Sequence, residues 1–341
     1  MDQDTQQVDP AAGPQMCPKL KIFSLPGQKP DTRFVLFGET EIQLHSIILK
    51  MHSAFFRQFL DSPDKQPAET SANFRYEWVS EIEEDGEWHM IDNCHAEPNN
   101  NKLSSREVQD IEILTFIEML NALYRIPYKV FVARLFIVTK MADYYCCLPA
   151  VSHNLYSCFA MTDNWYVRDY AVPLLDVAYK LRQPLLFKDC LIHIAGTMPP
   201  GSSKPNHLFN QKLWNVMMKV RNEINRRIIE CQRELLLVPH NEELKRLLGH
   251  CWEGGSEESN GRLSLPRYFR LLSNHDSAFA EILSDVLKCE LHLHTEVLQE
   301  AGGDPINDEE EDVKIRSNIN QFFCARLPDE ELPWDLTETD W

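Results

Sequence analysis

The sequence has no run of about 18 apolar residues, so a membrane-spanning helix is not expected. Its first residues, MDQDTQQVDPAAGPQMC, lack the charged-then-apolar order of a secretion signal. None of the ten cysteines belongs to a CxxC pair, and most of them lie in apolar helical stretches. We therefore expect reduced, buried thiols and an intracellular protein of the cytoplasm or nucleus.

Motifs of catalysis are also missing. There is no glycine-rich phosphate loop, no G-x-S-x-G turn and no H-E-x-x-H helix, so we expect neither an enzyme nor a bound cofactor. The pattern that comes closest to a metal site is Cys289-x-x-His292-x-His294. On a helix, His294 lies about 200° round from His292, so the three side chains cannot converge and no metal site is expected.

Basic residues are scarce: 34 Lys and Arg against 52 Asp and Glu give a formal net charge of −18. The imbalance lies in two segments. Residues 69–97 hold nine acidic residues and one basic residue, and residues 304–341 hold twelve acidic and three basic. The rest of the chain is nearly neutral. Because phosphate contacts need clustered Lys and Arg, nucleic acid is not an expected partner.

What the chain does contain begins with residues 1–30, whose five prolines predict a flexible arm with KLKIFSL as an edge strand. Phe34–Phe37 is then typical of a buried strand, Gly38-Glu39-Thr40 of a turn, and Ile42 and Leu44 of a second strand. From His45 the apolar spacing changes to three or four residues, which predicts a helix or a helical pair that ends at Pro63.

A second hairpin is predicted over residues 74–91. Its aromatic residues alternate on both sides of Asp85-Gly86, which suits a tight turn, and its acidic tip is expected to project into water. Apolar stripes then predict helices within 113–124, 131–145 and 151–159. These elements predict an α+β domain over residues 31–162.

Five segments of this domain resemble the BTB/POZ family. FVLF at 34–37 is similar to the family's buried strand, IQLHSIIL at 42–49 to its F-x-V-H-K-x-V-L pattern, and SAFFRQFL at 53–60 to its S-x-x-F-x-x-M-L pattern. FIEMLNALY at 116–124 is similar to the family's helix ending in F-L-Y, and VTKMADYY at 138–145 to its L-A-D-K-Y segment. The chain departs from the family pattern in two places. Ser46 stands where the family usually has Lys or Arg, and YRIPY at 124–128 replaces the usual Y-T-G turn. With the acidic hairpin, interpreted as an insert at 74–91, the chain most resembles fungal BTB proteins with a helical C-terminal half.

The resemblance implies a module for protein–protein interaction, and two of its sites have two interpretations each. His45 belongs either to a dimer or partner surface, or is a structural histidine that bonds nearby backbone, which we favour. Phe116-Ile117-Glu118 is similar to the hydrophobic-x-acidic motif by which some BTB proteins contact a cullin scaffold. A core position for Phe116 is the alternative.

The second half predicts an all-α domain over residues 165–300. Two helices broken near Gln183-Pro184 resemble the BACK-like helical extensions that follow BTB domains. Residues 206–238 predict one long helix of about 50 Å. Its apolar seam suits a coiled-coil partner or packing against helices predicted at 241–249, 263–273 and 275–300, and we favour this intramolecular bundle because Arg221 lies in the seam. The seam residues are Trp214, Met217, Arg221, Ile224, Ile228, Cys231 and Leu235.

Residues 301–341 carry the acidic run Asp308–Asp312 and predict an acidic, largely disordered tail. The tail nevertheless contains Phe322, Phe323 and Trp334. Apolar residues among acids are common in segments that dock on a groove, in cis or on a partner protein. Loose packing on the chain's own helical domain is the alternative.

Together these features predict a non-enzymatic adaptor whose BTB-like domain associates with itself or with another protein. One form is a substrate adaptor for a cullin-type ubiquitin ligase. The alternative is a nuclear regulatory or structural protein that acts through homodimerisation. The candidate partner-binding residues are Phe116, Glu118, His45, Phe322, Phe323 and Trp334.

Overall fold

The computed structural model describes residues 19–338 except for 63–72, 84–85, 94–104, 163–166, 168–169, 198–210, 236–264, 276, 289–322 and 326. The chain forms two compact units, residues 1–128 with 140–151, and residues 129–139 with 152–341. The division therefore falls within helices α4 (Val132–Tyr144) and α5 (Leu148–Phe159), and not at residue 162 as the sequence predicted.

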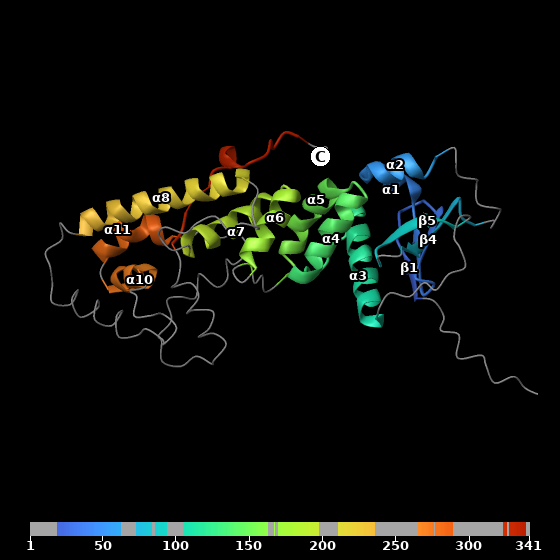
Figure 1. Ribbon diagram of the computed structural model, residues 1–341, viewed down its shortest axis with the longest axis horizontal. Helices are drawn as coiled ribbons and strands as arrows, with labels where there is room; N and C mark the ends of the chain where they lie inside the picture. Colours follow the sequence, from blue (N-terminus) through green and yellow to red (C-terminus); the bar gives the residue numbers. More distant parts are fainter. Residues whose placement is uncertain are drawn as a thin grey trace, which may run out of the picture. The chain divides into compact units, whose positions relative to one another are not determined.

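A mixed five-stranded sheet organises the first unit (Figure 1). Its strand order is β1-β3-β2-β4-β5. β3 lies antiparallel to β2 and parallel to β1, and β4 lies parallel to β2 and antiparallel to β5. The bounds are β1 Lys19–Ile22, β2 Thr32–Leu36, β3 Thr40–Leu44, β4 Tyr76–Ile82 and β5 Trp88–Asp92.

The first predicted hairpin is confirmed as β2 and β3. Both strands alternate buried and half-buried residues, as one-sided burial requires, and Phe34 pairs with Ile42. The turn places Phe37 at φ 50° and Gly38 at φ 68°. A side chain at positive φ is strained, and Phe37 is held there because its N–H donates to Ser80 Oγ at 2.6 Å.

The acidic hairpin is an integral part of this sheet, which corrects its interpretation as an insert. β4 pairs with β2 along Thr32–Val35, and Trp78 on β4 and Met90 on β5 are both 2% exposed. The tight turn is also confirmed, since Gly86 lies at φ 86° and its N–H donates to the Glu83 carbonyl. The N-terminal arm is shorter than predicted, because β1 and the buried Phe23 belong to the folded part.

Two short helices follow the first hairpin. They are α1 (Ser46–His52) and α2 (Ala54–Phe59), and Ser53 between them caps α2 by accepting the Phe56 N–H. The long helix α3 (Arg106–Leu123) lies beside the sheet (Figure 1). An aromatic cluster fills the space between these elements, with ring centroids 5.3 to 6.3 Å apart. Its members are Phe34, Phe56, Trp78, Phe116 and Tyr145.

The second unit is a helical bundle, as the sequence predicted. α7 packs against α6 and α8, and α11 packs against α8 and α10. The seam of α8 is therefore used within the chain, and Arg221 is buried in it, where burial lowers the pKa of its guanidinium. The helices are α6 (Ala171–Lys180), α7 (Pro184–Thr197), α8 (Gln211–Leu235), α10 (Leu265–His275) and α11 (Ser277–Leu287). The predicted helix at 241–249 lies outside the described residues.

Cysteine chemistry departs from the prediction at one position. Cys146, Cys147, Cys158, Cys190 and Cys231 are free thiols, whereas Cys324 is disulfide-bonded. Within the described ranges, none of the helices combines the length and the apolar character that a membrane crossing needs.

The Ser80 hydroxyl gives a test of the turn. Replacing Ser80 with Ala leaves the buried Phe37 N–H without its acceptor, and we expect the free energy of unfolding to fall by about 1–3 kcal/mol. Urea unfolding followed by circular dichroism measures the change. Ser157→Ala, at an exposed position of α5, is the control and should change stability by less than about 0.5 kcal/mol. Equal stability of the two variants would contradict this role of Ser80.

Candidate functional site

His45, which the sequence marks as either a partner-binding or a structural residue, is buried at 2% exposure. Its backbone N–H donates to the Tyr124 hydroxyl at 2.8 Å, and its ring nitrogens lie 3.0 Å from the same hydroxyl and 3.4 Å from the Gln28 carbonyl oxygen. Burial raises the pKa of Tyr124, so this phenol stays neutral. His45 therefore occupies a buried, hydrogen-bonded position, which agrees with the structural interpretation that the sequence favours.

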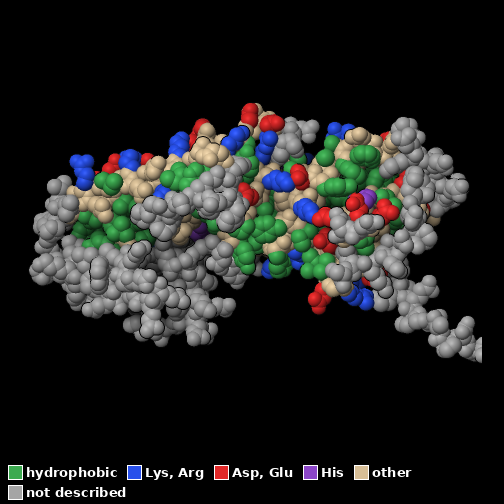
Figure 2. All heavy atoms as spheres, viewed as in Figure 1, with side chains coloured by type: hydrophobic (Ala, Val, Ile, Leu, Met, Phe, Trp, Pro, Cys, Tyr) green, Lys and Arg blue, Asp and Glu red, His purple; other side chains and the backbone are tan. Residues whose placement is uncertain are grey.

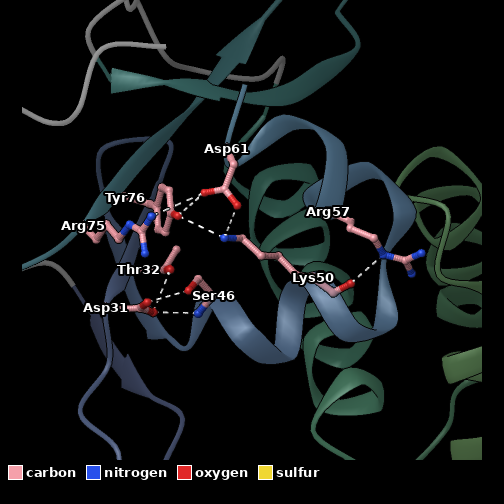
Figure 3. Close-up of polar contacts among 8 residues, drawn as sticks. All are labelled: Asp31, Thr32, Ser46, Lys50, Arg57, Asp61, Arg75 and Tyr76. Carbon is pink, nitrogen blue, oxygen red and sulfur yellow. Dashed lines mark hydrogen bonds and ion pairs between the residues drawn. The ribbon is translucent and has the colours of Figure 1, made fainter. Parts of the chain in front are cut away.

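Asp31 joins three elements beside His45 (Figure 3). Its carboxylate accepts the Ser46 N–H at 2.6 Å and the Ser46 hydroxyl at 2.5 Å, at the positive N-terminus of α1. Its backbone carbonyl accepts the N–H groups of Arg75 and Tyr76, where β4 begins. The start of α1 and the start of β4 are thereby fixed to the start of β2.

A polar latch, which we define as Lys50, Asp61 and Tyr76, closes the same corner. Asp61 accepts from the Lys50 ammonium at 2.6 Å and from the Tyr76 hydroxyl at 2.5 Å, and Lys50 also donates to Tyr76 at 3.0 Å (Figure 3). Those two hydrogen bonds lower the pKa of Asp61.

Proton transfer is not favoured by the latch. Burial raises the pKa of Tyr76. For Lys50, burial lowers the pKa, but the hydrogen bonds to Asp61 and Tyr76 raise it, and the net shift is upward. Lys50 is therefore charged and Tyr76 neutral at neutral pH, so neither serves as a general base. The latch holds α1 and the end of α2 to β4.

Phe116 and Glu118 do not form a surface motif. Phe116 is 0% exposed and packs against Trp88 and Tyr145 with centroids 5.5 and 5.7 Å away. Glu118 is 8% exposed. Neither side chain can contact a protein scaffold from these positions, and the alternative interpretation of Phe116 as a core residue is the one that the structure bears out.

The exposed apolar residues of the first unit lie elsewhere. Ile47 and Met51 on α1 are 64% and 57% exposed, one turn apart on one face, and Leu20 and Ile22 on the edge strand β1 are about half exposed. We use the name α1–β1 face for these four residues, which comprise one exposed pair on α1 and one on β1. Figure 2 shows hydrophobic side chains at the surface over α1 and α2. The run Ile47-Ile48-Leu49 is the sequence signal for such a face, because a helix cannot bury three successive apolar residues against one neighbour.

The C-terminal tail docks in cis over residues 323–338, which corrects the prediction of a largely disordered tail for this part. Phe323 is 6% exposed and packs against Phe269 at 5.6 Å. Trp334 packs against Phe187 on α7 at 5.0 Å and Tyr179 on α6 at 6.2 Å. Both residues therefore contact the chain's own helices, while Phe322 lies outside the described residues.

Acidic residues of the tail meet basic residues of the helices. Arg182, Lys188 and Lys219 pair with Glu338, Asp329 and Glu331 at 2.6, 2.6 and 2.9 Å. A cavity of about 890 Å³ lies between this part of the tail, α7 and α8.

Among the described residues, no group of three or more His, Cys, Asp or Glu side chains is placed to hold a metal ion. The Cys289, His292 and His294 pattern lies outside them. Comparison of the sequence and fold with protein-family models, curated proteins and solved structures finds no match. The function must therefore be argued from the surfaces themselves.

The latch predicts a pH dependence of stability. Because folding lowers the pKa of Asp61, its stabilisation is complete above the ordinary carboxyl range and is lost as the pH falls through the lowered pKa. The native protein should therefore be more stable than Asp61→Asn near pH 7, and the difference should shrink as the pH falls below the ordinary Asp pKa of about 4. Urea unfolding across this range measures it, with the exposed Glu234→Gln as control. A difference that is constant with pH would exclude the ionic contribution.

Proposed function

We propose that this protein is a non-enzymatic adaptor whose N-terminal unit associates with a second copy of the chain through the α1–β1 face. The observation that carries the proposal is the exposure of Ile47 and Met51, at 64% and 57%, on one face of a helix. Hydrophobic side chains scattered singly over a surface are ordinary. Two large ones on consecutive helical turns, in a unit that also exposes Leu20 and Ile22 on an edge strand, are typical of an interface.

The edge strand β1 supports the same proposal. It pairs with β3 on one side and is the last strand of the sheet on the other, and all four of its residues are exposed. An edge strand presents unpaired backbone groups that can pair with another chain. Helix packing and strand pairing would then act together in one interface.

The resemblance to BTB/POZ domains agrees with this assignment but does not carry it. The hairpin, the two short helices and the later α3 occur in the order in which the resembling segments were found in the sequence. Binding to a cullin scaffold is not supported by the two residues predicted to make the contact, because Phe116 and Glu118 are buried. No other described residue favours it, and self-association is the form that we retain.

Substitution of the α1–β1 face tests the proposal. The full chain of 39.7 kDa should have the mass of a dimer in light scattering at tens of micromolar, and Ile47→Asp with Met51→Lys should return it to a monomer. Because both side chains are exposed, the melting temperature of the monomeric variant should stay close to that of the native chain.

Ile229→Asp is the matched control. Ile229 is 57% exposed on α8, in the other unit, and its substitution introduces the same charge without touching the face. A native chain that is monomeric at this concentration, or a dimer that persists in the double variant, would refute self-association through α1.

A further inference from the structure

The docked tail has two parts that are held in different ways. The inner part, residues 323–325 and 327, is buried and is fixed by main-chain hydrogen bonds from Phe323 N–H to the Gly196 carbonyl and from Cys324 N–H to the Val286 carbonyl. The outer part, residues 328–338, which we call the outer strap, is mostly exposed. Its main-chain hydrogen bonds among the described residues stay within the strap.

Side chains alone therefore hold the outer strap on the helices. Three ion pairs join it to Arg182, Lys188 and Lys219, and the Trp334 ring packs on Phe187 and Tyr179. Ion pairs that are partly exposed are individually weak and are screened by salt. A segment held in this way can leave the surface without unravelling the bundle beneath it.

The strap also fills its groove incompletely. The cavity of about 890 Å³ remains beneath it and extends to Arg226 and Arg227 on α8, a volume that is typical of ligand sites. Among the described residues, the buried Trp334 indole N–H has no hydrogen-bond acceptor. A competing ligand whose anchor has no unpaired donor and which fills that space would fit the groove better than the strap does.

We propose that the groove formed by α6, α7 and α8 is a docking site for an acidic peptide segment of a partner protein with a tryptophan anchor, and that the outer strap occupies this site in cis. Charge complementarity argues for this partner, because the groove presents Lys188, Lys219 and Arg182 to three carboxylates in the strap. The partner's segment must compete with a tethered ligand, whose effective concentration is high. The site is independent of the α1–β1 face.

A peptide of residues 328–338 with a fluorescent label is the probe. Binding is measured by anisotropy to the full native chain and to a strap variant of the full chain, Asp329→Asn with Glu331→Gln and Trp334→Ala. We expect the strap variant to bind the peptide at least ten-fold more tightly than the native chain, because the competitor in cis is weakened. Raising the salt concentration should weaken this binding.

Two controls localise the binding. Adding Lys188→Glu and Lys219→Glu to the strap variant should abolish it, and a peptide with Ala in place of Trp334 should bind at least ten-fold more weakly. Equal affinity of the native chain and the strap variant, or binding that survives both lysine substitutions, would overturn the proposal.

A second measurement does not depend on any variant of the chain. The same peptide, with the aromatic photo-crosslinking residue benzoylphenylalanine as the anchor in place of Trp334, is added in excess to the native full chain, and the crosslinks are mapped by mass spectrometry. We expect crosslinks to α6 and α7 near Tyr179 and Phe187, at a yield that falls when unlabelled peptide is added. Absence of crosslinks to these helices would show that the strap is a fixed part of the bundle.

Discussion

The first unit depends on the hydrogen bonding of Asp31. Its carboxylate accepts from the N–H and hydroxyl of Ser46, its carbonyl accepts from Arg75 and Tyr76, and its own N–H donates to the Leu44 carbonyl. The start of α1 leaves backbone N–H groups unpaired and positive, and an anion from a neighbouring strand satisfies one of them. One residue thereby fixes a strand, a helix and the parallel strand β4 at a single corner, and His45 with Tyr124 closes the other side of that corner.

Local elements of this corner could be predicted from the sequence, because each depends on spacing over a few residues. The alternation of Phe34 and Leu36 indicates a strand, and Gly38 and Gly86 mark tight turns. The pairing of β2 with β4 could not be predicted in this way. It joins residues 32–35 to 76–79 across two helices and a loop, and alternation tells which face of a strand is buried but not which strand lies beside it. From sequence alone the acidic hairpin therefore resembles an insert, although Trp78 belongs to the core.

Phe116 shows how a motif and a periodicity can disagree. Its spacing from Ile113 and Leu120 places it on the buried stripe of α3, and the structure buries all three. The similarity of Phe116-Ile117-Glu118 to a scaffold-binding motif rests on three letters and takes no account of which helix face they occupy. The amphipathic period is the stronger signal, because burial of a phenylalanine side chain stabilises the fold by about 1.5–3 kcal/mol. A phenylalanine at the surface would not contribute this free energy.

The acidic excess of the chain acquires a local meaning in the second unit. Counted along the sequence, the tail and residues 69–97 are strongly negative and the remainder is nearly neutral. That count conceals the cluster of Arg182, Lys188 and Lys219 that the fold brings to one side of the bundle. The strap neutralises that cluster, whereas the α1–β1 face of the first unit carries exposed apolar side chains. Association through an apolar face is little affected by salt, while displacement of the strap is promoted by it. Ionic strength therefore separates the two surfaces, and a protein that uses both can regulate the second through the charge of its partner without changing the first.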